Sequence, residues 1–103
     1  MKEPTVAEKC ADLLKALADE GRLRIVQALR ERSQSVSDLA ALLDNDIKNI
    51  SHHLKVLRRQ GLVENRREGK TIIYSLAEQV RGGRRATTER LELGCCSLNM
   101  PRA

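Results

Sequence analysis

Three features of the sequence predict a mainly α-helical domain that carries one β-hairpin. Apolar residues recur at helical spacing from about residue 6 to residue 57. Residues that favour helix N-caps precede the expected helices, and Gly61 follows the last of them. After Gly61, two β-prone runs flank a short turn that contains Gly69. With 103 residues the core should be modest, so dimerisation would help to bury apolar surface.

The first three helices are indicated by their caps and their apolar positions. Thr5–Glu8 reads as a capping box, and the stripe that follows contains Val6, Cys10, Leu13, Leu14 and Leu17. Asp19 is suited to cap a second helix from about Glu20 to Glu31. Ser37 is expected to cap a short third helix that carries Leu39, Ala40, Leu42 and Leu43.

A fourth helix is expected from Asp46, its N-cap, to Gln60, with Gly61 as the C′ residue. The polar turn Asp44–Asp46 joins it to the third helix, which is the helix-turn-helix arrangement. Its two faces differ in character. We expect the core face to hold Ile47, Ile50, Leu54 and Leu57, and the opposite, basic face to hold Lys48, His52, Lys55 and Arg59.

The pattern becomes extended after Gly61. The runs 62–66 and 71–76 are β-prone, and residues 67–70 read as a hairpin tip in which glycine supplies the positive φ. The hairpin completes a winged helix-turn-helix domain over residues 1–80. Residues 81–103 form a C-terminal segment in which Gly82-Gly83 interrupts any long helix and Arg84-Arg85 adds basic charge. Residues 87–98 fit a helix or a strand equally well.

The charge balance favours a polyanionic partner. The chain has 19 Lys and Arg against 14 Asp and Glu, a formal net charge of +5, and a pI near 9.5. Tyr74 is the only aromatic residue. Because single-stranded nucleic acid is usually gripped by stacking on aromatic rings, double-stranded DNA is the favoured partner.

The sequence also predicts the compartment and the chemistry of its thiols. It contains neither a transmembrane-length apolar run nor a signal peptide, so we expect a cytoplasmic protein without a membrane partner. In that reducing compartment its 3 cysteines read as metal ligands, reactive thiols or packing residues, and no disulfide is expected. Neighbours such as Cys95 and Cys96 suit a disulfide poorly, because consecutive Cα atoms lie only about 3.8 Å apart.

Candidate DNA contacts follow from the place of each polar residue on the fourth helix and the hairpin. Lys48, Asn49 and His52 lie in the first turns, the part of a recognition helix that meets base edges. The candidate phosphate contacts on the helix are Ser51, Lys55 and Arg59. In the hairpin, Arg66, Arg67 and Lys70 are candidates for phosphate or minor-groove contacts. The competing interpretation is a solvated helix face and a charged hairpin edge. We expect His53 to be packed or hydrogen-bonded, not a metal ligand.

Three segments resemble the ArsR/SmtB family of winged-helix repressors: LLKALADEGRLRIVQALRER, SDLAALL and ISHHLKVLRRQGLVENRREGKTIIYSL. The resemblance covers roughly residues 8–76. It implies a homodimer that binds a palindromic operator and releases it when a metal or metalloid binds, or when thiols are modified. The chain departs from two usual inducer sites of the family. Residues 35–39 contain no Cys-x-Cys pair, and no histidine follows His53.

The remaining candidate inducer ligands are Cys10, Cys95 and Cys96. In dimers of the family the first helix packs beside the C-terminal segment, so the resemblance implies that the two chain ends meet. Three thiolates suit As(III) or Sb(III), which bind three sulfurs in a trigonal pyramid, with Cd(II), Pb(II) or Bi(III) as alternatives. Cys10 has the competing interpretation of a small apolar residue on a helix stripe.

Other classes of function stay open on the sequence alone. A thiol redox or persulfide sensor would use the same DNA-binding domain and respond to peroxide or polysulfide. A winged-helix module that binds protein would leave the basic helix face unexplained. An enzyme is not expected, because a catalytic cysteine needs an adjacent base and both histidines belong to the fourth helix.

Overall fold

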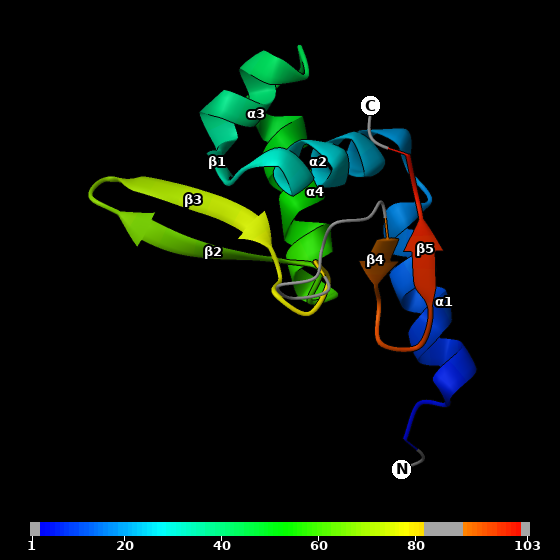
Figure 1. Cartoon of the computed structure of the whole chain (residues 1–103). Coiled ribbons are helices and arrows are strands. Elements are labelled where there is room, and N and C mark those ends of the chain that lie inside the picture. The colour runs from blue at the N-terminus through cyan, green and yellow to red at the C-terminus, as the bar shows by residue number, and fades with distance from the viewer. Residues whose placement is uncertain (1–2, 82–89, 102–103) are drawn as a thin grey trace.

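The computed structural model describes residues 3–81 and 90–101, and four helices and a hairpin form its body (Figure 1). The helices are α1 (Val6–Leu17), α2 (Glu20–Glu31), α3 (Val36–Leu42) and α4 (Ile47–Arg59). The strands are β1 (Gln34–Ser35), β2 (Val63–Glu68), β3 (Thr71–Leu76), β4 (Arg90–Glu92) and β5 (Ser97–Asn99). The winged helix-turn-helix fold is therefore confirmed. The predictions for Gly82-Gly83 and Arg84-Arg85 lie outside the described residues.

The predicted N-caps of α1, α2 and α4 are confirmed, whereas that of α3 is wrong. Thr5 and Glu8 form the capping box of α1, with both hydrogen bonds at 3.1 Å. The cap of α3 is Ser35 and not Ser37. The Ser35 hydroxyl accepts from the Asp38 backbone N–H at 3.1 Å, and the Asp38 carboxylate accepts from the Ser35 backbone N–H. This reciprocal pairing stabilises the earlier start.

The core lies where the helices meet the inner face of the hairpin. Ile50, Leu54 and Leu57 on α4 are fully buried, as predicted, against residues such as Ile25 and Leu39. Ile47 is wrong as a core residue, because its side chain is 54% exposed. It is the first residue of α4 and lies within a stretch of exposed residues, 44–49, at the junction of the two helices of the helix-turn-helix.

The β-hairpin is the predicted wing, joined by a third strand that was not predicted. β2 pairs with β3 in antiparallel register, Gly69 at the tip has φ +63°, and the short β1 pairs with the other edge of β3. The Gln34 side chain is buried and donates to the Ala28 carbonyl at 3.3 Å. The strand β3 is therefore central and held on both edges, which fixes its direction relative to α4.

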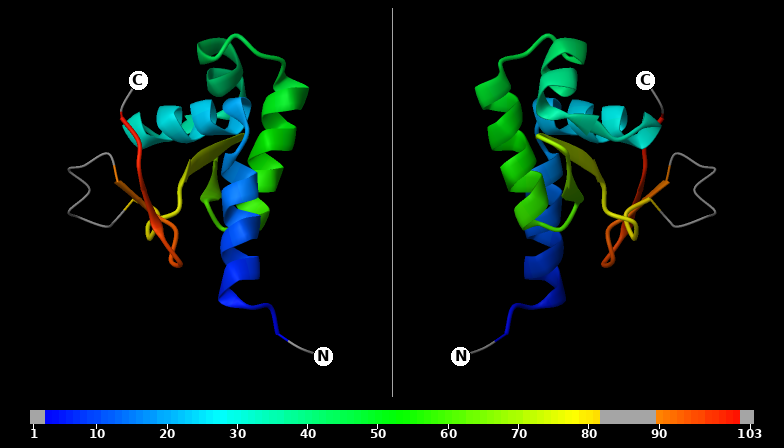
Figure 2. Two further views of the ribbon diagram at one scale, coloured as in Figure 1. Left: turned by 90° about the vertical axis from the view of Figure 1, so that its right-hand side faces the viewer. Right: turned by 90° about the vertical axis from the view of Figure 1, so that its left-hand side faces the viewer.

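The C-terminal segment forms a second hairpin, β4–β5, with the two neighbouring cysteines in its turn. Residues 90–92 and 97–99 are strands on either side of that turn, so the described part of the predicted helix-or-strand segment is a hairpin and not a helix. Residues 87–89 lie outside the described part. Leu91 and Leu93 are buried. Gln27 and Arg30 of α2 donate to the carbonyls of Pro101 and Met100 at 3.1 and 2.8 Å. Figure 2 shows this hairpin on the side of the molecule away from α4.

Candidate functional site

The basic face of α4 is open to solvent along its whole length. Asp46 caps the helix by accepting a hydrogen bond from the Lys48 backbone N–H at 2.6 Å. The helix begins at Ile47, so the predicted base contacts Lys48, Asn49 and His52 lie in its first two turns. All six predicted DNA contacts on this helix are exposed: Lys48, Asn49, Ser51, His52, Lys55 and Arg59. The Asn49 amide donates to Oδ1 of Asn45 at 3.2 Å. A bidentate adenine contact by Asn49 would therefore compete with this hydrogen bond.

The predicted contacts of the wing lie on β2 and at its tip, and all are exposed. Arg66 forms an ion pair with Glu68 at 2.7 Å, and Arg67 donates to the Gly69 carbonyl at 3.2 Å. Lys70 has no ion pair with any described residue. The structure thus leaves Lys70 the most available cation of the wing, while Arg66 would have to exchange one anionic partner for another.

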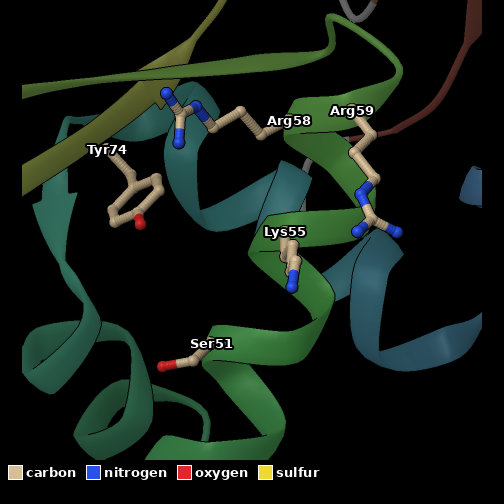
Figure 3. A pocket seen from close by; sticks show the side chains of 5 residues that line it. All are labelled: Ser51, Lys55, Arg58, Arg59 and Tyr74. Atoms are coloured by element: carbon tan, nitrogen blue, oxygen red, sulfur yellow. The ribbon is translucent and has the colours of Figure 1, made fainter.

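A pocket between α4 and β3 brings together residues that the sequence reasoning only partly identified. Its volume is about 490 Å³, and its lining consists of Ser51, Lys55, Arg58, Arg59 and Tyr74 (Figure 3). Arg58 and Tyr74 were not among the predicted contacts. Arg58 is exposed and follows Lys55 by three residues, which makes the two neighbours on the helix surface. That spacing is the sequence signal by which Arg58 could have been predicted as a contact. No sequence signal places Tyr74 opposite α4, because the two belong to elements that are separated in the sequence and meet only in the folded chain.

His53 is packed between α4 and the start of α2, as predicted, and it is not part of the cluster of three cysteines. Its Nδ1 lies 3.3 Å from Nη1 of Arg22 and 3.8 Å from Oδ2 of Asp19. The Arg22 backbone N–H donates to Asp19 and holds the pKa of that carboxyl below its ordinary value, helped by the Arg22 and His53 charges. A Cβ atom on Gly21 would stand 2.8 Å from Nε2 of His53, so a larger residue there would require the His53 ring to shift.

The first helix and the C-terminal hairpin meet at the three cysteines. Cys10 of α1 and Cys95 of the C-terminal hairpin form a disulfide with their Cα atoms 5.9 Å apart. The expectation that no disulfide would form is therefore wrong for this pair. Cys96 is free and half-buried, with its Sγ 3.9 Å from that of Cys95. All three Sγ atoms lie within 4.8 Å of one another.

The sulfur positions fit a soft ion once the disulfide is reduced. With metal–sulfur bonds of about 2.3 Å, two thiolates on one tetrahedral ion stand roughly 3.8 Å apart. The Cys95 and Cys96 sulfurs already have that separation. The Cys10 and Cys95 sulfurs, which are bonded to each other in the disulfide, would have to move apart. The three side chains together offer sulfur ligands and no oxygen or nitrogen, a donor set that selects thiophilic ions.

The family model for bacterial regulatory proteins of the arsR family matches residues 19–65. A transcriptional repressor SmtB homolog from Synechocystis is 43% identical over 72 residues, covering 70% of this chain and 54% of that protein. The cadmium resistance regulatory protein CadC from Listeria innocua is 41% identical over 61 residues, covering 58% of this chain and 51% of that protein. The chain thus spans about half the length of these two relatives.

A solved structure of reduced HlyU from Vibrio cholerae has the same fold. It superposes with a TM-score of 0.66 and 41% sequence identity, covering 69% of this chain and 75% of that one. HlyU is named a transcriptional activator. The matched part of this chain therefore carries the scaffold of bacterial transcriptional regulators, and these relatives are regulators and not enzymes.

Proposed function

Since the chain belongs to the ArsR family of bacterial regulatory proteins, we propose that it is a DNA-binding repressor released from its operator by a thiophilic metal(loid). Arsenite or antimonite is the proposed inducer. The relatives include both repressors and activators, since the SmtB homolog is a repressor and HlyU is an activator. Repression is therefore part of the proposal. The proposed setting is the cytoplasm, where thiols are kept reduced.

Operator binding is supported by the exposed basic face of α4 beside the basic wing. The N-terminal turns of a recognition helix meet base edges, and those of α4 present Lys48, Asn49 and His52 to solvent. The wing extends beyond α4 (Figure 1), where it would reach the adjacent groove. Residues 1–80 are thus the proposed DNA-binding domain.

Homodimer formation is supported by apolar side chains of α1 that the chain leaves uncovered. Val6 is 71% exposed and Leu14 is 40% exposed, although both belong to the predicted apolar stripe. A second copy of α1 and of the C-terminal segment 81–103 would bury them. Dimerisation also matches a palindromic operator, since each protomer would read one half-site about one helical turn from the other.

A thiophilic inducer is supported by one observation above all, the approach of three sulfurs to within 4.8 Å. Three thiolates complete the coordination of As(III) or Sb(III), whereas closed zinc sites need a fourth ligand. Cadmium is the next candidate because CadC is a cadmium resistance regulator, and Pb(II) and Bi(III) follow on thiolate chemistry. Tenfold weaker DNA binding in the metallated form requires about 1.4 kcal/mol of coupling.

A second candidate function is thiol redox sensing, and the Cys10–Cys95 disulfide favours it. Oxidation would link α1 to the C-terminal hairpin covalently, and Cys96 lies close enough to exchange with the bond. The solved HlyU structure is described as the reduced form of that protein, so redox state is specified for at least one relative. In this alternative, peroxide or polysulfide releases the DNA and arsenite does not.

A mobility-shift titration distinguishes the candidates. The reduced, full-length chain is bound to the DNA upstream of its own gene, and arsenite, antimonite, cadmium, zinc, peroxide and polysulfide are added separately. Release by arsenite and antimonite at the lowest concentrations supports the proposal. Release by peroxide or polysulfide alone would replace it with redox sensing, and no retention of duplex DNA at low salt would exclude both.

A further inference from the structure

The described side chains that line the pocket between α4 and β3 all carry hydrogen-bond donors, and none of them is acidic. Lys55, Arg58 and Arg59 contribute cations, while Ser51 and Tyr74 contribute hydroxyl groups. No carboxylate is among the lining residues in the described part of the chain. Figure 3 shows the Tyr74 hydroxyl and the Ser51 hydroxyl directed into the opening, with Arg58 reaching from α4 toward β3. Cations beside hydroxyl donors suit an anion with several oxygens.

These groups are free to accept such an anion. Within residues 3–81 and 90–101, no ion pair engages Lys55, Arg58 or Arg59, and no hydrogen bond engages the Tyr74 hydroxyl. Arg66 in the wing differs, because Glu68 already neutralises it. An anion in the pocket would therefore gain charge-assisted hydrogen bonds without breaking any internal contact.

The position of the pocket identifies the source of the anion. It lies between the helix that would enter the major groove and the hairpin that would reach the neighbouring minor groove. A sugar-phosphate strand separates these two grooves along any duplex. A strand passing from one element to the other must cross the pocket, and it carries one phosphate at each nucleotide.

We propose that this pocket holds one backbone phosphate of duplex DNA, with Arg58 as its charged partner and Tyr74 as its hydroxyl donor. The inference rests on the proposed DNA binding and adds two contacts to it. Tyr74 belongs to the central strand β3, where it is paired with Gln34 on one side and Asn65 on the other. A donor held this firmly fixes the register of the phosphate strand relative to α4.

Salt-dependent DNA affinity tests the two contacts separately. The full-length, reduced chain is compared with Arg58→Gln, Tyr74→Phe and the control Lys15→Gln, which removes an equal charge from the exposed surface of α1. Arg58→Gln should weaken operator and unrelated duplexes alike and lower the slope of log K against log salt by about one. Tyr74→Phe should weaken both by roughly three- to tenfold and leave the slope unchanged, because no charge is lost. Lys15→Gln should match the wild type.

Neutral linkages locate the phosphate. Operators that carry a single methylphosphonate at successive positions are titrated with the wild type and with Arg58→Gln. At one position per half-site the neutral linkage should weaken the wild type by roughly fivefold or more and leave Arg58→Gln unaffected, since both changes remove the same contact. Inorganic phosphate alone, followed by calorimetry, should show no saturable binding.

The outcomes separate this inference from the proposed function. If Arg58→Gln and Tyr74→Phe bound duplex DNA with the same affinity and salt dependence as Lys15→Gln, the phosphate pocket would be refuted and the proposed DNA binding would stand. Saturable binding of inorganic phosphate without coupling at any linkage would assign the pocket to a small anion and also overturn it. A chain that bound no duplex at low salt would overturn the pocket and the proposed function together. If one neutral linkage and Arg58→Gln affect the same contact but arsenite does not release the DNA, the phosphate pocket is supported and only the proposed inducer is refuted.

Discussion

Cys10 and Cys95 lie 85 positions apart in the sequence and are joined at a Cα–Cα distance of 5.9 Å. This contact ties the middle of α1 to the turn of the C-terminal hairpin. It brings the first helix and the C-terminal hairpin together, and Cys10 lies on the same helix stripe as the exposed apolar residues Val6 and Leu14. A change in the ligands of these sulfurs would therefore act on the proposed dimer interface and not on α4 directly.

Oxidation and metal(loid) binding should exclude each other. In the oxidised chain only Cys96 keeps a thiol, and one sulfur cannot hold As(III) firmly. We expect the reduced chain to take up one arsenic atom per protomer and the oxidised chain none. Native mass spectrometry of both forms after arsenite treatment measures this directly, and equal uptake by the two forms would show that Cys10 and Cys95 are not ligands.

Two substitutions to alanine at the core face of α4 should be costly, and one at its first residue should not. Ile50→Ala and Leu54→Ala should each lower the free energy of unfolding by about 2–5 kcal/mol, because both side chains are fully buried. Ile47→Ala is the matched control, and it should change stability by about 0.5 kcal/mol or less because Ile47 is 54% exposed. Urea unfolding of the three variants gives the comparison. A large loss at Ile47 would indicate that a partner chain covers it.

Asp19 should contribute to stability in a pH-dependent way. Folding lowers the pKa of this carboxyl from 3.8, so its contribution is fully present above pH 3.8 and is lost as the pH falls through the lowered value. Asp19→Asn retains a good N-cap but cannot titrate. Urea unfolding at a series of acidic pH values should therefore show a smaller loss of stability for Asp19→Asn than for the wild type. Parallel curves would show that the Asp19 pKa is unchanged by folding.

The base contacts and the phosphate contacts should respond differently to substitution. Lys48→Ala should alter which operator bases are preferred, because Lys48 lies in the first turn of α4. Lys70→Ala at the wing tip should instead weaken all duplexes by a similar factor and reduce the salt slope by about one. Fluorescence anisotropy with operator variants at several salt concentrations measures both. If Lys70→Ala left affinity and slope untouched, the wing would not contact DNA.

Local signals in the sequence were sufficient for most of the body. The caps Thr5, Asp19 and Asp46 and the stop at Gly61 each depend on residues within one helical turn, so each could be predicted. The cap of α3 was missed because two serines stand near the start of the helix. Ser37 lies inside α3, and only Ser35 has Asp38 three residues later to complete a capping box.

The remaining features depend on contacts between distant segments. The strand β1 is two residues long and exists only because β3 offers an edge. Tyr74 joins the pocket through the packing of β3 against α4, and the Cys10–Cys95 bond depends on where the C-terminal hairpin docks. The family resemblance implied that the ends would meet. The residues alone indicated which thiols were available and not how they would be arranged.

Arsenite-induced release of operator DNA by cysteine variants tests the central claim most directly. The reduced wild type, Cys10→Ser and Cys95→Ser/Cys96→Ser are bound to labelled operator and titrated with arsenite while anisotropy is followed. All three should bind the operator equally without arsenite, since Cys10 on α1 and the cysteine pair in the turn between β4 and β5 are not among the proposed DNA contacts of α4 and the wing. The wild type should release the DNA, Cys10→Ser should do so only at much higher arsenite, and the double variant should not release it. A double variant that released operator at the same arsenite concentration as the wild type would contradict the account.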